Sequence, residues 1–158
     1  MNIFEFQMIL KNELIEFLKQ SDLKNLKGVK LNIIDRFFEN FDHESCPILT
    51  IQMAAFSEPR GETEQFFFRK PFTMSFLLIL IDYSMKGWED ADYIVWDLFA
   101  KIIKKIEEFF EIRTDITEKL REATLSNVIP GVSEVEENRF FSSLRGNLDI
   151  AVKLEALD

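Results

Sequence analysis

The chain has 158 residues, of which 47% are hydrophobic, and this length and composition predict one globular domain over residues 1–158. Its formal net charge of −9 disfavours nonspecific binding to nucleic acid and docking on anionic lipid, because both need a basic surface. The single cysteine, Cys46, excludes an intrachain disulfide and fits a reducing compartment.

No targeting or membrane-spanning segment is expected. Glu5 interrupts the first apolar run, and no small-residue cleavage site follows it. The longest apolar run, residues 76–81, is too short to cross a bilayer. We therefore expect a protein that is cytoplasmic at synthesis and has no membrane partner.

The N-terminal third predicts a helix followed by two strands. Residues 2–20 carry apolar side chains at helical spacing, with charged residues between them. A turn at Gly28 leads into a strand over 29–37, where apolar and polar residues alternate. A polar loop separates this strand from a second one over 48–56, which Pro47 opens.

Residues 57–64 predict a loop, since they include Pro, Gly and several charges and have almost nothing to bury. Basic and aromatic residues lie in and just after this loop. Basic residues with interleaved aromatics can bind single-stranded nucleic acid, but three cations in an acidic chain are too few to predict it, and no sequence readout of nucleic acid is expected. Arg and Phe often anchor protein contacts, so this stretch is the candidate interface, with plain surface charge as the alternative. Its residues are Arg60, Phe66, Phe67, Phe68, Arg69 and Lys70.

The most apolar strand is predicted over 73–83. Both of its side-chain parities are apolar, which is typical of a central strand with both faces covered. A second long helix should follow, because residues 94–110 have apolar side chains at helical spacing and Glu89, Asp90 and Asp92 suit its N-terminus.

The C-terminal part predicts a hairpin. Residues 114–123 are charged and predict either a short helical extension or an ordered loop. A turn at Pro130-Gly131 should precede arms over 132–143 and 147–155, with the hairpin turn near 144–146. The complete order predicts an α+β fold, with a mainly antiparallel sheet of about five strands and two main helices packed on one face.

No catalytic, cofactor-binding or metal-binding residues are predicted. A zinc site or a catalytic dyad would have to use His43, the only histidine, beside Cys46 in one polar loop. No glycine-rich loop precedes a helix, so phosphate binding is not indicated. The acidic run Glu134, Glu136 and Glu137 predicts an exposed strand face that either limits unwanted pairing or meets a basic patch on a partner.

Phenylalanine is unusually frequent, with 17 residues. Two interpretations remain open: some of the rings contact another chain, or the core is simply rich in phenylalanine.

The order of elements resembles that of phage tail-terminator and tail-completion proteins, and the resemblance covers nearly the whole chain. It consists of the helix near 2–20, the strand Pro-Ile-Leu-Thr-Ile-Gln and the long strand Phe-Thr-Met-Ser-Phe-Leu-Leu-Ile-Leu-Ile-Asp-Tyr, then the helix over 92–106 and the last strand, Asn-Leu-Asp-Ile-Ala-Val-Lys-Leu-Glu. The chain departs from the family in its phenylalanine content and in its longer segment 111–131.

The resemblance implies a structural protein, not an enzyme, that caps a tail tube and joins it to the neck or head. The implied partners are further copies of the chain in a ring such as a hexamer, the tube protein and neck or connector proteins. The implied location is a virion or a phage-tail-like particle, including contractile injection systems. Two alternatives stay open: a small-ligand carrier or enzyme with a pocket lined by phenylalanine, and an acidic module that binds a basic partner.

Overall fold

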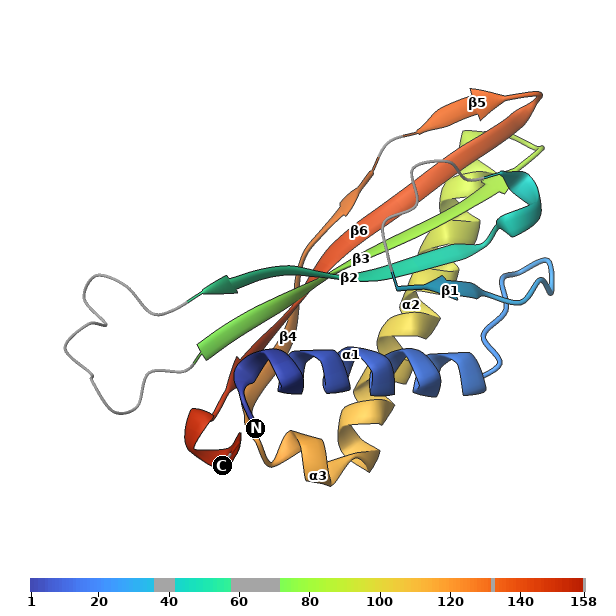
Figure 1. The fold of residues 1–158 in the computed structure, drawn as a ribbon. Coiled ribbons are helices and arrows are strands. Elements are labelled where there is room, and N and C mark those ends of the chain that lie inside the picture. The colour runs from blue at the N-terminus through green and yellow to red at the C-terminus, as the bar shows by residue number, and fades with distance from the viewer. Residues whose placement is uncertain (36–41, 58–71, 132, 158) are drawn as a thin grey trace.

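The computed structural model describes residues 1–35, 42–57, 72–131 and 133–157, and it has an α+β fold (Figure 1). Within these residues, three α-helices pack with one mixed sheet of six strands. The helices are α1 (Ile3–Gln20), α2 (Trp88–Ile112) and α3 (Thr114–Thr117). The strands are β1 (Asn32–Ile34), β2 (Ile48–Ser57), β3 (Phe72–Ser84), β4 (Leu120–Pro130), β5 (Glu134–Glu136) and β6 (Arg139–Val152), and short 3₁₀ turns lie at η1 (His43–Ser45) and η3 (Leu154–Leu157).

The strands follow the order β1-β2-β3-β6-β4, and β5 pairs with β6 beyond the end of β4. All pairings are antiparallel except that of β1 with β2, which is parallel. The α+β class is therefore as predicted, but the sheet has six strands where about five were expected, and one of its pairs is parallel.

The predicted N-terminal helix is confirmed as α1, and its first turn explains where it starts. The Glu5 backbone N–H donates to the Asn2 side chain at 2.8 Å, and the Asn2 N–H donates to the Glu5 carboxylate at 3.2 Å. This capping box satisfies N–H groups that have no partner within the helix. The apolar face of α1 is buried, including Leu10 and Leu14.

The second predicted helix is confirmed as α2. Gly87, at a φ of 136° that glycine tolerates best, precedes it, and the carboxylates of Glu89 and Asp90 lie in its first turn. The Ser142 hydroxyl of β6 donates to Asp92 at 2.5 Å, so this end of α2 is fixed to the sheet.

One large core cluster joins both long helices to a single face of the sheet. Alternate residues of β3 point into it, and Phe76, Leu78 and Leu80 have no exposed surface. Leu10 and Leu14 of α1 and Leu98 and Ile102 of α2 belong to the same cluster. Burying a side chain of this size stabilises the fold by about 1.5–3 kcal/mol, so this layer holds the two helices on one side of the sheet.

The strand predicted over 48–56 is confirmed as β2, and the central strand predicted over 73–83 as β3. The strand predicted over 29–37 is shorter: among the described residues only Asn32–Ile34 pairs in the sheet. Residues 36 and 37 lie outside the described part.

The C-terminal hairpin differs from the prediction. Its turn is at Glu137 and Asn138, which have φ values of 50° and 63°, and the predicted turn at 144–146 lies inside β6. The segment after the short helix α3 forms strand β4, which the sequence did not predict. Pro130-Gly131 does not reverse the chain, because β4 and β5 both pair with the same side of β6.

Candidate assembly surface

The sheet face opposite α1 and α2 carries apolar side chains that the two helices do not cover. We call it the open face. On β3 it presents Leu77, Ile79 and Ile81, which are half-buried and alternate with the fully buried core residues. Within the described residues, the prediction that both faces of this strand are covered by other elements holds for the core face, whereas the open face is only partly covered. A strand with one face in water normally carries polar residues on that face; β3 has them only at its start, at Thr73 and Ser75, and is apolar from Leu77 to Ile81.

A small second core closes one end of the open face. Cys46, Ile48 and Phe141 are buried together there, and Ile34, Ile81 and Tyr83 pack against them. The Tyr83 and Phe141 rings lie with centroids 5.4 Å apart. The apolar strip along β3 therefore runs out from a packed cluster toward the exposed middle of the sheet.

Polar side chains border the strip on the neighbouring strands. Leu77 lies between Gln52 of β2 and Asn147 of β6, and Arg145 of β6 lies beside Ile79. Farther along, the carboxylate of Asp149 accepts hydrogen bonds from the hydroxyls of Ser75 and Ser126, both at 2.5 Å, which ties three strands together. An apolar centre with a polar border is the composition of many protein–protein contacts.

A second exposed apolar surface lies on the first turns of α1. Phe4, Met8 and Ile9 are 60%, 43% and 42% exposed, although they belong to a helix whose other face is in the core. Grouped apolar residues of this kind are more informative than single ones, because they mark contact sites on soluble proteins.

The residues predicted as an interface, Arg60, Phe66, Phe67, Phe68, Arg69 and Lys70, lie outside the described residues. Other phenylalanines are placed: Phe4 is exposed, whereas a larger group is buried, namely Phe6, Phe76, Phe99, Phe109 and Phe141. Much of the phenylalanine content within the described chain is therefore core.

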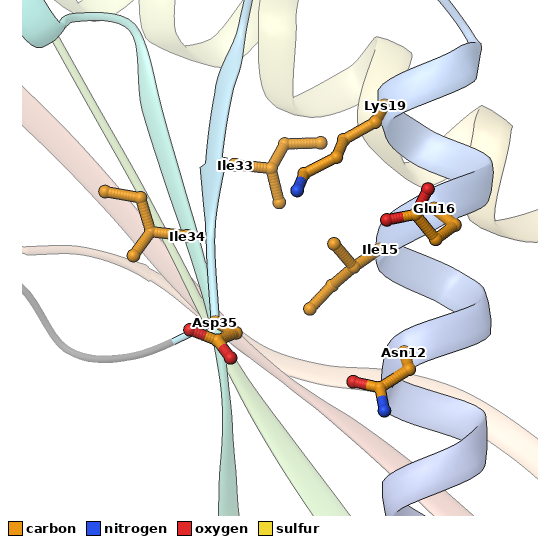
Figure 2. A pocket seen from close by; sticks show the side chains of 7 residues that line it. All are labelled: Asn12, Ile15, Glu16, Lys19, Ile33, Ile34 and Asp35. Atoms are coloured by element: carbon orange, nitrogen blue, oxygen red, sulfur yellow. The ribbon is translucent and has the colours of Figure 1, made fainter.

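The structure contains a groove of about 390 Å³ between α1 and β1 (Figure 2). Ile15 and Ile33 point toward one another across it, and Lys19 lies at one end. Glu16, Asn12 and Asp35 complete much of its lining. None of its described lining residues is a phenylalanine, so the described part of this groove does not match the aromatic pocket of the ligand-binding alternative.

The loop with His43 and Cys46 is organised by hydrogen bonds around Asp42. Its carboxylate accepts from the Ser45 N–H and hydroxyl, both at 3.0 Å, and this hydrogen bonding lowers the pKa of Asp42. The Cys46 thiol donates to the Asp42 carbonyl oxygen at 3.6 Å, and the His43 ring lies edge-on to Tyr83. Burial raises the pKa of Cys46 to about 12, which disfavours the thiolate that nucleophilic chemistry needs.

A buried polar pair lies beneath one end of β3. The Asn25 side chain donates to the Asp82 carboxylate at 2.8 Å, and both residues are almost completely buried. Burial raises the pKa of Asp82, while the Asn25 hydrogen bond opposes that effect. The pair fastens the loop after α1 to the sheet, and sequence reasoning did not identify it because the partners are far apart in the chain.

Neither a scan against protein-family models nor a search of curated proteins finds a match for this chain. Within the described residues, no helix is long and apolar enough to span a membrane. In the same part of the chain, no group of three or more His, Cys, Asp or Glu side chains could hold a metal ion.

Proposed function

We propose that the chain is a structural subunit that assembles with its own copies into a ring closing the end of a phage-tail-like tube. One observation carries the proposal: Leu77, Ile79 and Ile81 form an apolar strip on the open face, and the chain's own helices leave it partly exposed. Covering that strip with another chain would gain about 25 cal/mol for each Å² of apolar surface removed from water.

The arrangement of the sheet also suits such a subunit. β4 forms an edge strand, since within the described residues it pairs only with β6. Its pairing is interrupted near Leu120 and near Ser126, and such bulges limit uncontrolled strand addition. A subunit built in this way would associate through selected surfaces. In the proposed particle, its other partners are the tube protein and a neck or connector protein.

Size-exclusion chromatography with light scattering tests the proposal, together with electron microscopy of the protein mixed with polymerised tube protein from the same genome. We expect either a ring of several copies or a monomer that forms rings on tube ends. A chain that stays monomeric at all concentrations and never binds the tubes would overturn the proposal.

A further inference from the structure

Two oppositely charged surfaces lie at opposite edges of the sheet (Figure 1). The loop between α1 and β1 carries Lys24, Lys27 and Lys30 at the β1 edge. The hairpin of β5 carries Glu134 and Glu136 at the other edge, beyond β6. In a chain with a net charge of −9, such a local group of lysines is a distinct feature.

The lysine loop is held in one conformation. The buried Asn25 side-chain oxygen accepts from the N–H groups of Lys27 and Val29, both at 2.9 Å, and its amide nitrogen donates to Asp82. A backbone bridge joins Lys24 to Lys30. The loop therefore displays Leu26 and Val29, which are 47% and 45% exposed, on a rigid support. Contacts made by a preorganised loop cost less ordering entropy.

Beside this loop lies a groove of about 450 Å³ between the end of β3 and the start of α2. Leu26, Met85 and Tyr93 give it an apolar lining, and Met85 and Tyr93 are 64% and 65% exposed. Lys27 and Lys86 supply positive charge, and the one carboxylate in the lining, Asp90, accepts a hydrogen bond from the Ser84 hydroxyl. The Lys27 ammonium donates to the Tyr83 carbonyl oxygen at 2.9 Å and lies 4.1 Å from the centre of the Tyr83 ring. We call this surface the lysine groove.

The β5 hairpin has the complementary composition. Val135 is 55% exposed, and the carboxylates of Glu134 and Glu136 are exposed on either side of it in the sequence. Within the described part of the chain, neither of these glutamates forms an ion pair, and neither do Lys30 and Lys86. Lys24 does pair with Asp22 at 3.7 Å, but among the described residues each surface keeps apolar area and charges without an ion-pair partner.

We propose that the lysine groove of one copy receives the β5 hairpin of the next copy. The proposal rests on the proposed function, because it names the contact through which the copies associate. The two surfaces are built from different residues: the groove from the connection of β3 to α2 together with the loop before β1, and the hairpin from β5 and the start of β6. Each copy therefore carries both. Contacts of this kind close into a ring when the rotation between copies permits it. Successive side chains of β5 point to opposite faces, so Val135 would enter the apolar groove while Glu134 and Glu136, on the other face, would reach lysines at its rim and fix the register.

Charge reversal on each surface tests the contact by sedimentation velocity at low salt. We expect Glu134→Lys/Glu136→Lys and Lys30→Glu/Lys86→Glu each to weaken self-association by at least tenfold. Mixing the two variants should restore it, because every contact in an alternating assembly is then between opposite charges. High salt should weaken the wild-type assembly. Lys104→Glu/Glu111→Lys on α2 also reverses two exposed charges, without changing the net charge, and should associate like the wild type.

The outcomes separate this contact from the proposed function. If the wild type forms rings and both variants form them equally well, the contact is wrong and the proposed function stands. If both variants lose association but their mixture does not regain it, the pairing of these two surfaces is also wrong. If the wild type never associates, alone or on tubes, the proposed function fails and the contact fails with it.

Discussion

At the residue scale, the surroundings of Cys46 decide whether its thiol can react. Its thiol is buried in the small core on the open face, close enough to Asp82 for that carboxylate to oppose ionisation further. Sequence reasoning could note Cys46 beside His43 but could not predict that the thiol would be enclosed. The burial that removes its reactivity comes from strands far away in the chain.

We expect the thiol to react slowly while the chain is folded. With a pKa of about 12, almost none of Cys46 is thiolate at neutral pH, and only the thiolate attacks a disulfide reagent. The rate measured with an aromatic disulfide at mildly alkaline pH should rise by orders of magnitude in denaturant. Equal rates in the folded and unfolded chain would show that the thiol is accessible.

Asp82 makes folding stability depend on pH in a defined direction. Burial raises its pKa above the ordinary 3.8, so the folded chain keeps this proton to higher pH than the unfolded chain does. The contribution of Asp82 to stability is therefore fully present below pH 3.8, and it is lost as the pH rises through the pKa that Asp82 has in the folded chain.

Replacing Asp82 by Asn removes this titration. We expect the unfolding free energy of Asp82→Asn, relative to the wild type, to shift in favour of the variant as the pH rises above 3.8 and then to level off. Urea unfolding across this range measures the difference. The same series on the exposed Glu111→Gln shows the effect of removing an ordinary surface carboxyl. If the difference in unfolding free energy between Asp82→Asn and the wild type did not change with pH, the raised pKa of Asp82 in the folded chain would be contradicted.

At the scale of elements, helices and strands with a regular apolar spacing were predicted correctly, whereas elements with an irregular pattern were not. The helices α1 and α2 were predictable because their apolar spacing and N-terminal residues agree. Strand β4 was missed because it is a bulged edge strand, with exposed residues in no clean alternation. A turn was predicted around Gly146, but this glycine lies inside β6, where a side chain would meet Val128 and Leu125 at 3.2 and 3.3 Å.

The true hairpin turn has no glycine, which is why it was not recognised. Glu137 and Asn138 both have positive φ, the geometry of a two-residue type I′ turn, for which Asn-Gly is the favoured sequence. Glu137 is strained there, and its ion pair with Arg139 is exposed and contributes little.

Changing this turn to Glu137→Asn/Asn138→Gly should stabilise the chain by about 1 kcal/mol, since both new residues tolerate left-handed backbone. Chemical unfolding of the double variant and of each single variant measures the gain. We expect most of it from Glu137→Asn. A loss of stability in that single variant would show that its ion pair matters more than its backbone conformation.

At the scale of the whole molecule, the apolar pattern of β3 has two possible explanations that sequence alone does not separate. A strand with apolar residues on both parities has the same sequence whether its second face meets a helix or another chain. The core face of β3 lies under α1 and α2, while Leu77, Ile79 and Ile81 remain half-buried. The candidate interface predicted from the sequence was a basic, aromatic stretch, but the described chain offers the open face and the two charged edges instead.

Substitution of Leu77→Thr/Ile79→Thr tests which explanation holds. Threonine is β-branched, a shape that strands favour, and both side chains are already partly in water, so the loss of monomer stability should be about 1 kcal/mol or less. If the strip is covered by another copy, association measured by sedimentation should weaken by much more. The matched core variant, Leu78→Ala, should instead cost about 2–5 kcal/mol of stability, because its side chain is fully buried. A large loss of stability with unchanged association would mean that the strip serves the fold of the single chain.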